Sequence, residues 1–143
     1  MAQTNASLEI PAAKTDIWGI ISDPSSYEKW LTLHTKWKDE PPTELALGTQ
    51  MTEVVSIMGM PNTITWNVDA YEAPKSLTIS GTGMAGAKVT FTLSVEGGND
   101  SSVATIDAEF ISQMMVGAIG AAVERTAAKE LDQSLANLSA LVA

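Results

Sequence analysis

Residues 89–110 read VTFTLSVEGGNDSSVATIDAEF, and two alternating runs of apolar and polar residues in this stretch decide the fold. In 89–95 the odd-numbered residues are apolar, and in 104–110 the even-numbered residues are apolar. A period of two is typical of a strand with one buried face, and the intervening GGND is typical of a turn. The stretch therefore predicts an antiparallel hairpin that keeps one face dry.

The same signal recurs through the preceding chain. The expected strands before this hairpin lie at 6–10, 35–38, 51–57, 64–70 and 77–79, and the expected turns before it lie at 59–62, 72–75 and 81–86. The polar residues of these runs alternate with the apolar ones, so each strand exposes one face to water. This arrangement is typical of an antiparallel meander.

Two short helices are expected between the first and second strands. The apolar residues of 17–21 fit one face of a helix, and Asp16 lies near its positive end, where a carboxylate is favourable. Asp23 followed by Pro24 is typical of an N-cap and a first helical residue, so a second helix is expected to run on to Trp30.

A long helix is expected from about residue 114 to 142. Leu131, Leu135, Leu138 and Val142 form an apolar stripe at helical spacing. No helix separates the later strands, so parallel crossover units are excluded. We therefore expect one α+β domain over residues 1–143, in which a curved antiparallel sheet of seven strands wraps around the C-terminal helix.

Composition and charge exclude several classes of function. The 17 acidic and 8 basic residues give a formal charge of −9, which disfavours contact with nucleic acid. There is no cysteine, and the N-terminus lacks the basic and apolar regions of a signal peptide. No run approaches 18 uninterrupted apolar residues, so we expect no membrane insertion and a cytoplasmic protein.

A sheet curved around one helix encloses a space that side chains need not fill. At about 24 cal/mol per Å³, an empty void of ~300 Å³ costs on the order of 7 kcal/mol, which is comparable to the net stability of a domain. Such a space is therefore expected to hold side chains, water or a ligand. A hydrophobic small molecule is the ligand that an apolar lining favours.

The residues expected at this space combine aromatic rings, aliphatic side chains and methionine, which adapts to varied apolar partners. The predicted ligand-binding set is Trp30, His34, Trp37, Met51, Val55, Trp66, Ile79, Phe91, Met115, Ile119 and Ala122. Trp30, His34 and Trp37 are placed near its mouth. The alternative is that the methionines simply fill the core.

Two titratable residues are candidates for acid–base chemistry. Glu53 shares the strand parity of Met51 and Val55, which would point a carboxylate inward, where it needs a partner or a raised pKa. A β-bulge that turns it outward is the alternative. His34 is the only histidine, and an ordinary loop residue is the interpretation that we favour for it over a functional role.

The glycine-rich run GTGMAG at 81–86 formally matches a dinucleotide-binding fingerprint. That fingerprint requires a helix directly after it, whereas the strand 89–95 follows here. We interpret the run as a hairpin tip. With one histidine and no cysteine, the chain offers no histidine or thiolate cluster for a metal, and no cofactor is expected.

Four segments near the N-terminus carry a resemblance to a known family. The runs LEIPAA at 8–13, DIW at 16–18, ISDP at 21–24 and YEKWL at 27–31 resemble the opening signature of the START-like SRPBCC superfamily, in its polyketide cyclase/dehydrase-like branch. The later runs GMPN, TW and GTG resemble actinobacterial members of that branch, some of which are described as the toxin of a toxin–antitoxin pair.

The resemblance implies a helix-grip fold with a hydrophobic cavity, shared by lipid carriers, hormone receptors and cyclases. It transfers no catalytic residue. Three functions are expected: binding of a hydrophobic or amphipathic small molecule, a cyclase or dehydratase activity that uses Glu53 or His34, and a regulatory role through an antitoxin-like partner. Apolar surface near Met114 could serve a homodimer or a portal to the cavity.

Overall fold

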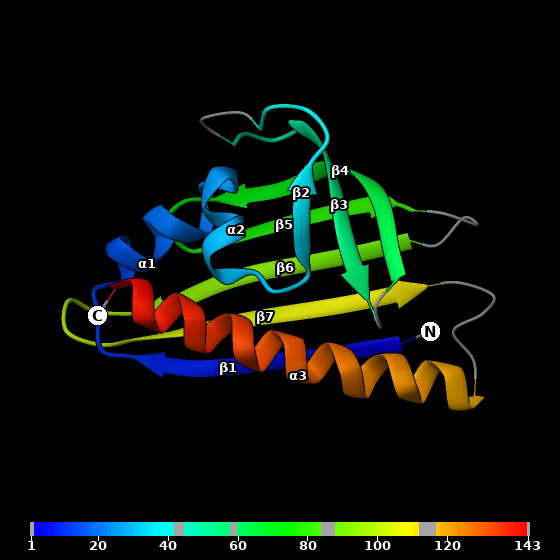
Figure 1. Ribbon diagram of the computed structural model, residues 1–143. Helices are drawn as coiled ribbons and strands as arrows, with labels where there is room; N and C mark the ends of the chain where they lie inside the picture. Colours follow the sequence, from blue (N-terminus) through cyan, green and yellow to red (C-terminus); the bar gives the residue numbers. More distant parts are fainter. Residues whose placement is uncertain (1, 42–44, 58–59, 84–87, 112–116, 143) are drawn as a thin grey trace.

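The computed structural model describes residues 2–41, 45–57, 60–83, 88–111 and 117–142, without the side chains at positions 2, 57, 60, 118 and 119 (Figure 1). The elements in chain order are β1 (Ala2–Ile10), α1 (Lys14–Ile21), the 3-10 turn η1 (Pro24–Ser26), α2 (Tyr27–Trp30), β2 (His34–Trp37), β3 (Gln50–Ile57), β4 (Met60–Glu72), β5 (Ser76–Thr82), β6 (Lys88–Gly97), β7 (Ser102–Ile111) and α3 (Gly117–Val142).

The seven strands form one antiparallel sheet in the order β1-β7-β6-β5-β4-β3-β2. The first strand closes against the last, and the others follow as a meander. The helices lie on one side of the sheet, with α3 crossing it beside β1 and β7 (Figure 1). The predicted fold, a curved seven-stranded sheet that grips a C-terminal helix, is confirmed.

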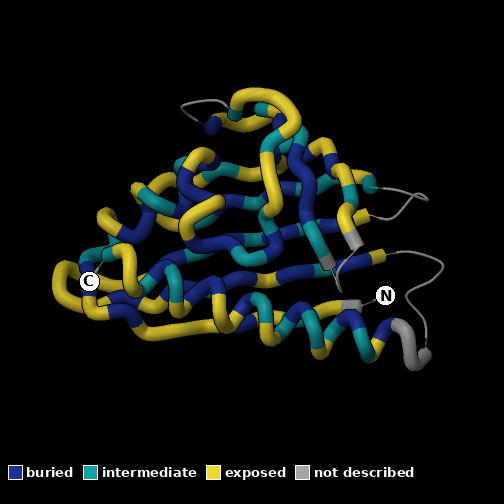
Figure 2. The backbone as a smooth tube through the Cα atoms, in the orientation of Figure 1, coloured by how far each residue is buried: buried dark blue, intermediate teal, exposed yellow. Residues whose placement is uncertain are grey.

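Alternate residues of the strands are buried, as the pattern of two predicted (Figure 2). Phe91 on β6 lies opposite Ile79 on β5 and Ala108 on β7, so the apolar residues of neighbouring strands share the inner face. Two of the described residues are exceptions: Leu8 is 36% exposed, and Ala70 is exposed after a register shift between β4 and β5. Leu8 lies on β1, an edge strand that pairs only with β7.

The three helices follow their sequence signals. Asp23 caps η1 by accepting a hydrogen bond from the Ser25 amide at 3.1 Å, and Pro24 is the first residue of that turn. The predicted stripe of α3 lies against the core, where Leu131, Leu135 and Leu138 are fully or almost fully buried. Of the helices in the described part, none is both long and apolar enough to cross a membrane.

Two predicted turns are shorter than expected by two or more residues. Residues 60–62 belong to β4, and Gly81 and Thr82 belong to β5. A Cβ atom on Gly81 would lie 2.5 Å from both the Ile64 side chain and the Thr65 carbonyl oxygen. The glycine therefore permits close approach of β5 to β4 and is not part of a hairpin tip.

Candidate functional site

Glu53 lies on the inner face of the sheet and is completely buried. Strand β3 pairs with β4 without interruption, from Gln50 opposite Asn67 to Ile57 opposite Met60. Glu53 therefore keeps the parity of the buried residues on either side of it. The alternative of a bulge that turns the carboxylate outward is wrong.

Both oxygens of the Glu53 carboxylate have partners. The indole N–H of Trp66, on the neighbouring strand β4, donates to Oε1 at 2.7 Å. The Nδ1 atom of His34, on β2, is in direct contact with Oε2. Removing a carboxylate from water is costly unless hydrogen bonds or an opposite charge replace the lost solvation. His34 and Trp66 supply that replacement.

A β-bulge in β2 brings His34 to this carboxylate. His34 pairs with Val55, but after a register shift Lys36 pairs with Val54 and Trp37 pairs with Glu53. Without the shift, Lys36 would stand opposite Glu53 on the inner face, because pairing would advance one residue at a time on each strand. The bulge places His34 and Trp37 on the same face and leaves Lys36 exposed.

The interpretation of His34 as an ordinary loop residue is wrong. His34 begins β2, and its side chain is 3% exposed. His34 also borders a cleft of about 350 Å³ beside α2 and α3; the other lining residues are Glu28, Lys29, Trp30, Leu31, Thr32 and Asn137. Because Nδ1 is occupied by Glu53, Nε2 is the ring nitrogen left to exchange a proton with a bound molecule.

Aromatic rings pack around the histidine. The ring centroid of Tyr27 lies 5.6 Å from that of Trp30, 5.7 Å from that of Trp37 and 6.4 Å from that of His34. The Trp30 indole N–H donates to Ser26 Oγ at 3.1 Å, and the Trp37 indole N–H donates to the Pro24 carbonyl oxygen at 3.1 Å. Both indole groups are therefore satisfied within the chain.

The Tyr27 hydroxyl is the exception. Tyr27 is 1% exposed, and its oxygen has no hydrogen-bond partner among the described residues. Burial, reinforced by the negative charges of Glu53 and Asp23, raises the pKa of Tyr27 well above its ordinary value of 10.0. The group is thus a neutral phenol with an O–H available to donate.

The segment between α2 and β2 is fastened to α3. The Thr32 amide donates to Ser134 Oγ at 3.0 Å, and the Thr32 hydroxyl donates to the Glu130 carbonyl oxygen at 3.1 Å. The Asn137 side-chain amide donates to the Trp30 carbonyl oxygen at 3.3 Å. These bonds hold the aromatic and histidine residues in a fixed position relative to the grip helix.

The predicted apolar wall lies on the inner face beside this polar cluster. Met51, Val55, Trp66, Ile79 and Phe91 are all buried, with at most 4% of any of them exposed. Trp66 and Phe91 pack with ring centroids 5.2 Å apart. The structure therefore brings the five wall residues together on the same face of the sheet as Glu53.

Three members of the predicted binding set lie on or before α3. Met115 and the apolar segment around Met114 are outside the described residues. Only the backbone of Ile119, within α3, is described. Ala122 is half-buried.

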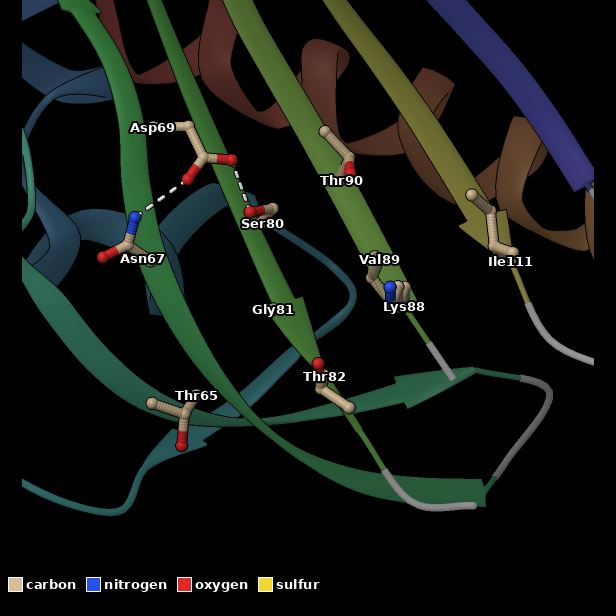
Figure 3. A pocket seen from close by; sticks show the side chains of 10 residues that line it. All are labelled: Thr65, Asn67, Asp69, Ser80, Gly81, Thr82, Lys88, Val89, Thr90 and Ile111. Atoms are coloured by element: carbon tan, nitrogen blue, oxygen red, sulfur yellow. Dashed lines mark hydrogen bonds between the residues drawn. The ribbon is translucent and has the colours of Figure 1, made fainter. Parts of the chain in front are cut away.

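A hollow of about 620 Å³ lies on the opposite, outer face of the sheet, with the helices behind it (Figure 3). Asp69 lies in this hollow, where it accepts hydrogen bonds from Ser80 and from the Asn67 amide. The predicted ligand-binding residues do not line this hollow. In the described ranges, no three acidic or histidine side chains gather closely enough to hold a metal ion.

Sequence reasoning missed the role of Tyr27. It placed the residue in the second helix and assigned it no contact. Tyr27 and Trp30 are three residues apart and so share one face of a helix. Because Trp30 was expected at the mouth of the cavity, this spacing was the available signal that Tyr27 faces inward as well.

The burial of Tyr27 predicts a loss of stability in alkali. A raised pKa in the folded state leaves stability unaffected below the unfolded pKa near 10 and reduces it as the pH rises further, by about 1.4 kcal/mol per pH unit. In Tyr27→Phe this decline should disappear. Urea denaturation between pH 9 and 11.5 measures it, and Tyr71→Phe is the control. An equal decline in wild type and Tyr27→Phe would contradict the assignment.

Comparison with known proteins places this geometry in a family. Residues 1–143 match the family described as polyketide cyclase / dehydrase and lipid transport. Toxin Rv0910 from Mycobacterium tuberculosis is 31% identical over 137 residues, which are 96% of this chain and 95% of that protein. Uncharacterized protein Rv1546 from the same species is 30% identical over 141 residues, 99% of each chain.

Solved structures agree on the fold. A START superfamily protein from Mycobacterium smegmatis matches with a TM-score of 0.77 and 20% identity, over 99% of this chain and 97% of that one. Major latex-like protein 151 from Panax ginseng matches with a TM-score of 0.70 and 11% identity, over the same shares of the two chains. With the predicted resemblance confirmed over its whole length, the chain belongs to the polyketide cyclase / dehydrase and lipid transport family.

Proposed function

We propose that this protein binds a hydrophobic or amphipathic small molecule, lipid-like or polyketide-like, between the inner face of the sheet and α3. The wall of the proposed site is Met51, Val55, Trp66, Ile79 and Phe91, with Ala122 on α3. From the sequence we add Met115 and Ile119 to this wall. The mouth of the site is formed by Trp30, His34 and Trp37.

The observation that carries the proposal is the buried carboxylate of Glu53, which is hydrogen-bonded to Trp66 on a mainly apolar inner face. A sheet stabilised by packing alone gains little from such a group, since an apolar side chain of similar volume is often neutral or stabilising there. Ligand sites, in contrast, are mainly apolar with a few polar groups that orient the ligand. The lipid transport members of the family support the same function.

Native mass spectrometry of the freshly purified protein tests the proposal directly. We expect a defined extra mass on the 15.1 kDa chain that is lost under denaturing conditions. If the chain is bare, the neutral fluorescent probe N-phenyl-1-naphthylamine should still enter the site and gain intensity. If the protein carries no extra mass and the fluorescence of the probe does not increase, the result would count against an internal site.

Filling the site should block the probe without unfolding the protein. Ala108 is 1% exposed and lies opposite Phe91 on the inner face. In a filled core, Ala108→Leu would lower the free energy of unfolding by about 1–3 kcal/mol, because the larger side chain overpacks its surroundings. Next to an open space the same substitution should lower the free energy of unfolding by under ~1 kcal/mol and should reduce probe binding. Urea denaturation and probe titration measure the two effects.

Ala104→Leu is the matched control, because Ala104 is fully buried on the same strand and lies opposite Val95, which is not a residue of the wall. We expect the full overpacking cost there and unchanged probe affinity. Equal destabilisation at both alanines, with unchanged binding in both variants, would contradict an open space beside Phe91.

An acid–base enzyme is a second candidate, favoured by the contact between His34 and Glu53 and by the cleft that reaches the histidine. In this function Glu53 orients the imidazole, and Nε2 moves a proton during cyclisation or dehydration of a carbonyl-rich substrate. Glu53→Gln and His34→Ala should lower turnover by about 10²–10⁴-fold and abolish its pH dependence. Turnover of a linear triketone measures this, and unchanged rates would remove the candidate.

A regulatory function through a protein partner is a third candidate, favoured by the relative named Toxin Rv0910. It predicts that expression of this chain arrests growth and that co-expression of the neighbouring gene product relieves the arrest. Growth curves with inducible expression measure both effects. Normal growth on expression of a folded chain would remove this candidate.

A further inference from the structure

The Tyr27 hydroxyl is a buried polar group whose partner is not supplied by the described residues. A hydroxyl kept from water without a hydrogen bond costs about 1–3 kcal/mol, and such groups are rare in native proteins. Phenylalanine at this position would keep the ring packing and avoid that cost. The hydroxyl is therefore expected to have a use that packing does not explain.

The neighbouring polar groups are already engaged. Trp30 donates to Ser26 and Trp37 donates to Pro24, while both Glu53 oxygens are occupied by Trp66 and His34. In the described part of the chain none of these groups reaches the Tyr27 hydroxyl, so a bound molecule or a water is the partner to consider.

We propose that Tyr27 donates its hydroxyl hydrogen to a neutral carbonyl oxygen at the polar end of the hydrophobic ligand. The ligand class is thus an apolar molecule that carries a ketone, ester or amide, and it is neither a pure hydrocarbon nor a free carboxylic acid. This inference rests on the proposed function, because it assigns one end of the same binding site.

Charge at the site favours a neutral acceptor. Glu53 is buried close enough to Tyr27 for its charge to act on the phenol, and among the described residues His34 is the one basic group in contact with Glu53. A carboxylate ligand would add a second anion in a low-dielectric interior whose one base is already paired. A carbonyl oxygen accepts the same hydrogen bond without that repulsion.

Three probes of nearly equal size separate these possibilities: 2-acetylnaphthalene carries a ketone, 2-ethylnaphthalene has no polar group, and 2-naphthoate is an anion. Calorimetric titration with wild type and Tyr27→Phe gives the affinities. In Tyr27→Phe we expect the ketone to bind about tenfold more weakly and the ethyl compound to bind within about twofold of wild type, as the loss of one hydrogen bond requires. Tyr71→Phe, at the only other tyrosine, should leave all three affinities unchanged.

The carbonyl stretch of the bound ketone is an independent readout. With a carbon-13 carbonyl, the infrared band of 2-acetylnaphthalene should lie at lower frequency in wild type and in Tyr71→Phe than in Tyr27→Phe, because a donated hydrogen bond weakens the C=O bond. Circular dichroism verifies that both variants are folded. An unshifted band in wild type would overturn the inference.

The failures are distinguishable. If the ketone and the ethyl compound both bind and Tyr27→Phe changes neither affinity, a water is the partner of the hydroxyl, and the inference is wrong while the proposed function stands. Tighter binding of 2-naphthoate than of the ketone would also overturn it. If wild type binds none of the three probes, the proposed site itself fails, and the inference fails with it.

Discussion

The buried carboxylate of Glu53 is the constraint on which the arrangement of the site depends. A charged or hydrogen-bonding group of this kind is tolerated inside a protein only when its oxygens are satisfied. Trp66 satisfies one oxygen from β4, and His34 satisfies the other from β2. A regular β2 would place Lys36 opposite Glu53. Because of the bulge, Trp37 takes this position instead. One carboxylate thus accounts for the position of the histidine and for the irregularity of the edge strand.

The bulge also determines how the helices contact the sheet. With Trp37 turned inward, its ring packs on Tyr27 and its indole N–H reaches the Pro24 carbonyl oxygen. Thr32 then fastens the same segment to α3. The site is therefore built across the edge strand, the short helices and the grip helix. A change in any of these elements should therefore alter the position of the His34 side chain. A preorganised site requires such support from the surrounding elements.

The alternating pattern of residues 89–110 predicted the sheet, and the parity of Glu53 predicted an inward carboxylate. Both predictions were possible because a strand that buries one face has apolar residues at every second position. The partners of Glu53 were not predictable in this way. A bulge changes which residues face inward, and β2 has only four residues, too few for a pattern to reveal it. The Tyr27 hydroxyl, which has no partner among the residues described, was also not predictable, since a sequence shows which groups can form hydrogen bonds but not which of them do.

Binding and catalysis at this site are related functions, because both would use the same carbonyl group of the ligand. A carbonyl oxygen that accepts from Tyr27 is polarised, and the ring of His34 lies 6.4 Å from that of Tyr27. A carbon next to such a carbonyl is acidified, and loss of its proton to a base such as Nε2 is the first step of an aldol cyclisation. Removing the phenol would weaken binding in either case, whereas removing the imidazole would abolish turnover. Whether the protein carries its ligand or transforms it thus depends on whether an acidic C–H of that ligand comes within hydrogen-bond distance of Nε2.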